Sequence, residues 1–158
     1  MLLCAITLAC TLSTSSMAAD FTSYENSRFG FTIDLPLDFK TILIPETGDK
    51  IGLESADGSA GLSVWGNYIQ EIGFKAESGL GRDLQIEEGW KFTYEKRGPS
   101  WASFSGIREE RILYMRQIAL CDDAMGNLTI EYPASQQQRY DRLVEHLVKA
   151  LKAPSNCV

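Results

Sequence analysis

Apolar and polar side chains alternate over several short segments of the chain, a pattern typical of β-strands with one buried face. Residues 29–35 carry an aromatic or aliphatic side chain at every second position, and Pro36 ends the segment. Residues 21–24 precede this segment, and the short polar stretch 25–27 lies between the two. We therefore expect the two segments to pair as a hairpin.

The same reasoning predicts further strands along the rest of the chain. The predicted segments are a short extended piece at 42–44 and then 51–55, 60–68, 90–95, 101–107, 112–121 and 128–132. The clearest turn is Asp57-Gly58, because glycine readily adopts the positive φ of a tight hairpin. The first half of 112–121 is apolar on both faces, which is typical of a central strand covered on both sides.

A helical pattern follows the last predicted strand and covers residues 136–151. Ser135 and Gln138 have the spacing of a capping box at its start. Six apolar side chains fall on one stripe of this helix: Tyr140, Leu143, Val144, Leu147, Val148 and Leu151. Such a stripe must pack on a sheet.

A second, weaker helix is predicted over residues 74–88, with Gly89 as its stop. Glycines at positions 73, 79 and 81 each cost about 1 kcal/mol relative to alanine and weaken the pattern. The expected fold class is therefore α+β: an antiparallel sheet of about 6 to 8 strands, with the C-terminal amphipathic helix and this second helix packed on it.

Residues 1–19 contain no charged side chain, whereas Asp20 begins a chain rich in charge. The apolar run 2–12 has the length of a signal-peptide core and is far shorter than the ~20 residues of a membrane span. Small residues follow, so we expect a signal peptide over 1–19, cleaved after Ala18 or Ala19, and one domain over 20–158. No Lys or Arg precedes the run, so the amino terminus or a segment upstream would supply the positive charge.

Export leaves two cysteines in the mature chain, Cys121 and Cys157, and an oxidising compartment predicts a disulfide between them. Two free buried thiols are the alternative. The bond would restrict the unfolded chain by roughly 3 to 4 kcal/mol in the chain-entropy model. A final helix antiparallel to strand 128–132 would bring the tail back to Cys121 and pin it to the sheet edge. Cys10 is a poor lipid attachment site, because Leu is missing three positions before it.

The charge balance is acidic, with 15 Lys and Arg against 21 Asp and Glu and a net charge of −6. Such a chain lacks the basic surface that nucleic-acid binding requires. No hydrolase, phosphate-loop or dinucleotide motif occurs, and the one histidine, His146, is expected on a solvated helix face among Arg and Lys residues. Asp122-Asp123 and Asn127 lack the spacing of a calcium loop, so we expect no metal and no cofactor.

The unusual feature of the composition is its aromatic content, sixteen Phe, Tyr and Trp residues. Trp65 shares a strand face with Ser63 and Asn67 and is followed by Tyr68. Trp90 and Trp101 flank the Gly98-Pro99 turn on two strands expected to pair. Aromatic side chains on a sheet face line a ligand cleft or a protein-binding patch, and they also fill cores. The binding candidates are Trp65, Tyr68, Trp90 and Trp101.

Several short stretches resemble a group of small exported bacterial proteins of unassigned function. They are Tyr24-Glu25-Asn26-Ser27-Arg28-Phe29-Gly30-Phe31 with Ile33 and Pro36, then Ser55-Ala56-Asp57-Gly58, Val64-Trp65-Gly66, Ser105-Gly106, Tyr132-Pro133 and Tyr140-Asp141. That group in turn is similar to the PsbP-like fold, an antiparallel sheet with helices on its two faces. The resemblance implies an accessory or binding role and brings no catalytic residue.

The leading hypothesis is thus a periplasmic or secreted binding or accessory protein whose partner is an unknown envelope protein or a small ligand. One alternative is an envelope hydrolase that uses carboxylates such as Asp34, Glu54 or Glu87. Two carboxylates in one cleft, one with a raised pKa, would favour it. The other alternative is a structural protein that associates with itself through a strand edge.

Overall fold

A computed structural model describes residues 20–70 and 73–157 of the chain. The predicted signal peptide, residues 1–19, lies outside the described residues. The helices are α1 (Phe74–Glu87), the short 3₁₀ turn η1 (Ala134–Gln136) and α2 (Gln137–Ala150). The strands are β1 (Phe21–Glu25), β2 (Thr32–Pro36), β3 (Phe39–Leu43), β4 (Lys50–Ser55), β5 (Gly61–Tyr68), β6 (Lys91–Arg97), β7 (Trp101–Arg108), β8 (Arg111–Ala119) and β9 (Ala124–Pro133).

Seven of the strands form one antiparallel sheet in the order β3-β4-β5-β9-β8-β7-β6, and β1 and β2 pair as a separate hairpin. The predicted α+β class is confirmed. The predicted central position of 112–121 is also confirmed, because β8 lies between β7 and β9. The predicted turn at Asp57-Gly58 joins β4 to β5, and Gly58 has a φ of 69°.

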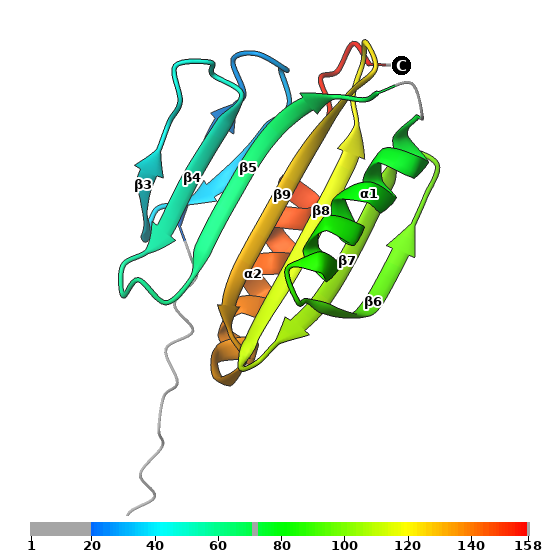
Figure 1. Ribbon diagram of the computed structural model, residues 1–158. Helices are drawn as coiled ribbons and strands as arrows, with labels where there is room; N and C mark the ends of the chain where they lie inside the picture. The colour runs from blue at the N-terminus through cyan, green and yellow to red at the C-terminus, as the bar shows by residue number, and fades with distance from the viewer. Residues whose placement is uncertain (1–19, 71–72, 158) are drawn as a thin grey trace, which may run out of the picture.

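The molecule has three layers (Figure 1). α1 lies on one face of the sheet, and α2 lies on the opposite face. α2 contacts β8, β9 and the β2 strand of the hairpin, so α2 and the β1–β2 hairpin cover the same side. We call the two sides of the sheet the α1 face and the α2 face. Successive side chains of a strand point alternately to the α1 face and to the α2 face.

The main core lies on the α2 face, between the sheet, the hairpin and α2. The hairpin contributes the buried side chains of Phe31, Ile33 and Leu35 to this core. The core also contains buried side chains from β4, β5, β8, β9 and α2. Tyr132 of β9 stacks on Tyr140 of α2, with ring centroids 4.8 Å apart. This stack joins the helix to the middle of the sheet.

The turn between β1 and β2 is held by a buried asparagine. The Asn26 side chain accepts hydrogen bonds from the backbone N–H groups of Arg28 (3.1 Å) and Phe29 (2.9 Å). Gly30 follows with a φ of 69°. The strand predicted from residue 29 therefore begins only at Thr32, because residues 29–31 belong to this turn.

A smaller core lies on the α1 face. It contains Trp90, Ala102, Phe104, Leu113 and Met115, with Phe92 at its margin. α1 covers it without a strong apolar stripe of its own. Polar anchors tie the helix to β6 and β7 instead: Arg97 donates to the Lys75 carbonyl (3.0 Å), and Arg108 donates to the Glu88 carbonyl (3.0 Å). The predicted helix at 74–88 with Gly89 after it is confirmed within one residue.

The tail after α2 ties three parts of the chain together. Lys152 exchanges two backbone hydrogen bonds with Thr32 at the start of β2 (2.9 and 3.0 Å). Cys157 then forms a disulfide with Cys121, with Cα atoms 5.1 Å apart. The expected pairing is thus present. The tail is attached at the end of central strand β8 and not along a lateral edge of the sheet.

Two sequence-based expectations for α2 are wrong. The helix begins at Gln137 with Gln136 as its N-cap, and no side chain caps it, because Ser135 belongs to the preceding 3₁₀ turn. His146 does not lie on a purely solvated face. Its Nε2 lies 3.0 Å from the Asp34 carboxylate of β2, and its ring stacks on Phe21 of β1.

The hairpin fits against the sheet only because β5 has glycine at position 66. A Cβ atom there would lie 2.2 Å from the ring of Phe29. We expect Gly66→Ala to reduce the free energy of unfolding by about 1 to 3 kcal/mol through overpacking, measured by urea denaturation. Gly61→Ala on the same strand is the matched control, because its Cβ would meet no atom within 4 Å. Equal losses in both variants would contradict this account of the hairpin.

Burial raises the pKa of Tyr132 to about 12, with smaller contributions from Asp141 and Tyr114. Above pH 10 the phenol ionises in the unfolded chain but stays protonated in the folded one, so the free energy of unfolding falls as pH rises from about 10 to 12. Tyr132→Phe keeps the stack on Tyr140 and removes this group. We expect its stability to fall less steeply over that interval in chemical denaturation. Parallel pH profiles would count against this role.

Candidate functional site

The structure separates the four aromatic residues that the sequence offered as binding candidates. Trp90 is buried in the smaller core, and the guanidinium of Arg108 lies 4.5 Å from its ring centroid. Tyr68 lies on the α2 face, where it meets the Phe29 ring edge-on at 5.2 Å. Both residues thus support packing between layers.

Trp101 also lies on the α2 face and is half-buried. It packs over the β6–β7 turn, where a Cβ at Gly98 would lie 2.3 Å from its indole nitrogen. The guanidinium of Arg116 lies 4.4 Å from the Trp101 ring centroid. Trp101 is thus far from Trp65 in the fold, on the other face of the sheet.

Trp65 occupies a part of the sheet that neither α1 nor α2 covers. It lies on the α1 face of β5, while α1 lies over β6, β7 and β8 (Figure 1). Ser63 and Asn67 flank it on the same face and are half-buried. Lys50, its partner on β4, brings its ammonium to 5.8 Å from the ring centroid. We call this the Trp65 surface: Lys50, Ser63, Trp65, Asn67 and Thr129.

A chain of side-chain amides borders the Trp65 surface. The Gln117 side-chain amide donates to Oδ1 of Asn127 (2.9 Å), and the Asn127 side-chain amide donates in turn to Oδ1 of Asn67 (2.7 Å). The backbone carbonyl of Trp65 is 3.4 Å from the same Asn127 amide. The amides hold the Asn67 side chain in place beside the indole, and such fixed polar groups next to an aromatic ring suit recognition.

Sequence reasoning missed this amide chain. It left Asn127 in the connection between the predicted strands 112–121 and 128–132, whereas β9 already begins at Ala124 and Asn127 is buried. The loop is shorter because Asp122 and Asp123 both adopt positive φ, at 55° and 50°. Alternation along β9 could have suggested a strand here, but the partners Gln117 and Asn67 come from other strands.

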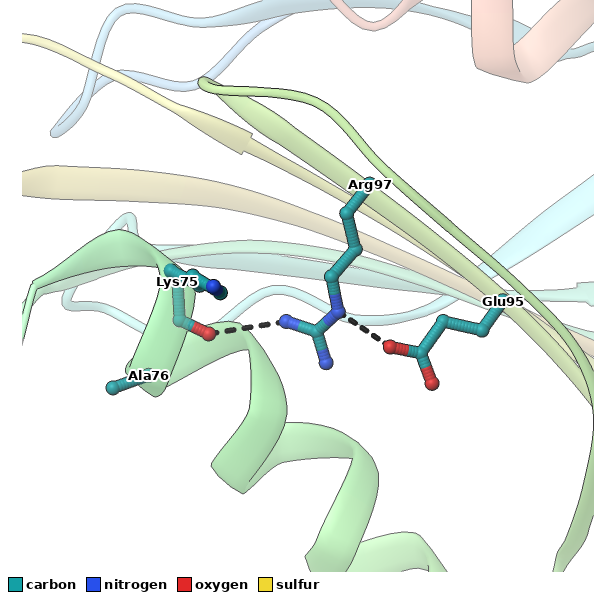
Figure 2. A pocket seen from close by; sticks show the side chains of 4 residues that line it. All are labelled: Lys75, Ala76, Glu95 and Arg97. Carbon is teal, nitrogen blue, oxygen red and sulfur yellow. Dashed lines mark hydrogen bonds and ion pairs between the residues drawn. The ribbon is translucent and has the colours of Figure 1, made fainter.

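An open cavity of about 570 Å³ lies between α1 and β6 on the α1 face, lined by Lys75, Ala76, Glu95 and Arg97 (Figure 2). The charges of Glu95 and Arg97 in this cavity are already paired. Arg97 donates to Glu95 (2.5 Å) and to Ser78 (2.9 Å) as well as to the Lys75 carbonyl. The bonds from Arg97 and Arg82 lower the pKa of Glu95. These contacts make the cavity a structural joint between α1 and β6.

The carboxylates considered for hydrolysis lie on different layers. Asp34 is on the hairpin, on the α2 side, where it faces His146. Glu54 is on the α1 face of β4, and Glu87 is in the last turn of α1. The structure therefore does not bring Asp34 into a common cleft with either of the other two.

Two further findings concern metal binding and membrane spans. Among residues 20–70 and 73–157, no three His, Cys, Asp or Glu side chains gather in a group that could hold a metal ion. In the same part of the chain, no helix has the length and apolar character needed to cross a membrane.

The arrangement of one seven-stranded antiparallel sheet, a hairpin and two helices on opposite faces is the PsbP-like fold. The solution structure of cyanobacterial PsbP (CyanoP) from Synechocystis sp. PCC 6803 is similar to this chain with a TM-score of 0.63. The match covers 91% of this chain and 96% of that chain, at 8% sequence identity. At this identity the likeness concerns the fold alone, and it confirms the fold that the sequence resemblance implied.

Comparison of the sequence itself gives no family. No protein-family model matches the chain, and no curated protein matches it.

Proposed function

We propose that the chain is an exported binding or accessory protein that works in a periplasmic or other extracytoplasmic compartment. The observation that carries the proposal is the Cys121–Cys157 disulfide within a PsbP-like fold. Structural disulfides persist in oxidising compartments and are rare in the cytosol of most organisms. The uncharged segment 1–19 supplies the export signal.

The Trp65 surface is the binding region of this proposal. It joins a half-buried indole, an ammonium group from Lys50 and an amide from Asn67 on a part of the α1 face that α1 does not cover. Tryptophan is enriched among the residues that dominate protein interfaces, because it buries a large area with little loss of side-chain freedom. The flat face suits a protein partner better than a small ligand, which prefers a concave site.

Self-association is a second candidate, favoured by the edge strand β3. Among the described strands, β3 has a neighbour on one side only. Ile42 and Ile44 at its end are 64% and 68% exposed, and Leu43 between them is also exposed. An exposed apolar strand edge is a template for pairing with another chain. At the other edge, β6 carries several charged side chains, which disfavour such pairing.

Export is tested by the mass and thiol state of the protein in cell fractions. We expect the extracytoplasmic fraction to contain a chain beginning at Ala19 or Asp20. Cys121 and Cys157 should be alkylated only after reduction. The control is a chain starting at Asp20, preceded by a start methionine and kept in the cytosol, whose thiols should react directly. Residues 1–19 retained on a cytosolic protein with free thiols would refute export.

Binding is tested by placing a photo-crosslinking residue at single positions of the exported protein. Ser63 reports on the Trp65 surface, Ile42 on the β3 edge, and exposed Glu87 of α1 is the matched control. We expect a discrete adduct with another protein from position 63 and none from 87. Trp65→Ala should reduce the yield from position 63, because the indole provides the contact area.

The partner's mass distinguishes the two candidates. An adduct of two copies of this chain from position 42, with none from 63, would favour self-association through β3. Absence of adducts from both positions would remove support for either surface.

A further inference from the structure

A second uncovered region lies on the α2 face, on the opposite side of the sheet from Trp65. α2 contacts β8 and β9, so this side of the sheet is left open at β6 and β7, although Ser103 of β7 is itself buried. Tyr94 of β6 is 40% exposed and Ile107 of β7 is 45% exposed. We call the residues Tyr94, Lys96, Trp101, Ser103, Tyr114 and Arg116 of this region the Arg116 surface.

The strand register places Arg116 at the β8 end of a row of polar side chains. Arg116 of β8 pairs with Ser103 of β7, which pairs with Lys96 of β6, so the three side chains form a row across the sheet. Tyr114 and Tyr94 belong to the next row on the same face. Two cationic side chains are thus flanked by phenol rings on one side and by Trp101 on the other.

The guanidinium of Arg116 is only partly satisfied. It lies over the Trp101 ring, and Nη1 donates to the Ser103 hydroxyl at 2.9 Å. Its Nε is buried and has no acceptor among the described residues. No carboxylate of the described chain forms an ion pair with Arg116, whereas Arg28, Arg82, Arg97, Arg111 and Arg139 each face one.

An unpaired guanidinium in this position is costly to the fold. Burial lowers the pKa of Arg116, yet an arginine does not lose its proton in a protein, so it remains a half-buried charge. Trp101 and Ser103 compensate for it in part, but neither supplies negative charge. An anion that docks on the surface would supply that charge and would add the charge-assisted hydrogen bonds that arginine forms with carboxylates.

We propose that the Arg116 surface binds an aspartate or glutamate side chain presented by an acidic segment of a partner protein. A flat sheet face with exposed Tyr94 and Ile107 offers contact area to a peptide segment beside the charge. Arginine, tyrosine and tryptophan are the residues most enriched at the energetic centres of protein interfaces. Lys96 at the rim adds a second positive charge, which favours the approach of an acidic segment.

The site is independent of the binding region proposed above, because Arg116 and Trp65 lie on opposite faces of the sheet. The two faces therefore offer two separate contacts. Failure of the Trp65 crosslinks would leave this site untouched, and its own test uses a different probe.

The test is an NMR titration of the isotope-labelled, disulfide-bonded chain with a blocked peptide, acetyl-Val-Glu-Val-amide. Its uncharged counterpart, acetyl-Val-Gln-Val-amide, is the matched probe. We expect the glutamate peptide to shift the Arg116 Nε–H and Trp101 indole N–H signals. The glutamine peptide should bind about tenfold more weakly or worse, because its neutral amide forms no charge-assisted hydrogen bonds with the guanidinium.

Arg116→Gln should abolish the preference for the glutamate peptide. Arg139→Gln, which removes an equal charge from the exposed side of α2, should leave it unchanged. Equal affinity for the two peptides, no shift of either signal, or an unchanged preference in Arg116→Gln would overturn the proposal. Shifts with inorganic phosphate and none with the glutamate peptide would overturn it in favour of a phosphate ligand. The comparison of the two peptides on the unmodified chain stands even where Arg116→Gln fails to fold.

Discussion

The structure depends on how one seven-stranded sheet is covered, because neither helix nor the β1–β2 hairpin is wide enough to cover a whole face alone. Seven strands spaced about 4.8 Å apart span roughly 30 Å, whereas one helix with its side chains is about 10 Å wide. On the α2 face the β1–β2 hairpin and α2 share the task, and α1 covers the far end of the other face. The main core forms only where hairpin, helix and sheet meet, so the remaining packing follows from how these three fit together.

That fit explains which residues the fold cannot do without. Glycine at position 66 leaves space for Phe29, and buried Asn26 fixes the turn that aims Phe29 at the sheet. The Tyr132–Tyr140 stack sets α2 beside the hairpin. This arrangement also leaves part of each face without a covering helix among the described residues, near Trp65 on one face and near Arg116 on the other. The polar and aromatic side chains that a binding protein can use stand in those uncovered parts.

The sequence allowed most of the fold to be predicted, because strands, the Asp57-Gly58 turn and the stripe of α2 are local patterns. The disulfide followed from two cysteines and the direction of the last helix. The sites were harder to predict, since they depend on partners far apart in the chain. His146 meets Asp34 across 112 positions, and Asn67 meets Asn127 across 60. Alternation shows that Trp90 has a buried face, but it does not show which layer covers that face.

The course of the tail has a consequence for the order in which the protein can fold. β5 pairs with β9, so Leu62 cannot find its partner Ile130 until that later strand exists. The β1–β2 hairpin near the beginning of the chain likewise pairs, through Thr32, with Lys152 near the end of the chain. Pairings between such distant segments form slowly, because the loop between them must first be ordered. The sheet therefore cannot be completed until β9 has been synthesised, and Cys157 reaches Cys121 only after that. Late closure of this kind leaves the apolar faces of the early strands without their full cover until the end of the chain has been made.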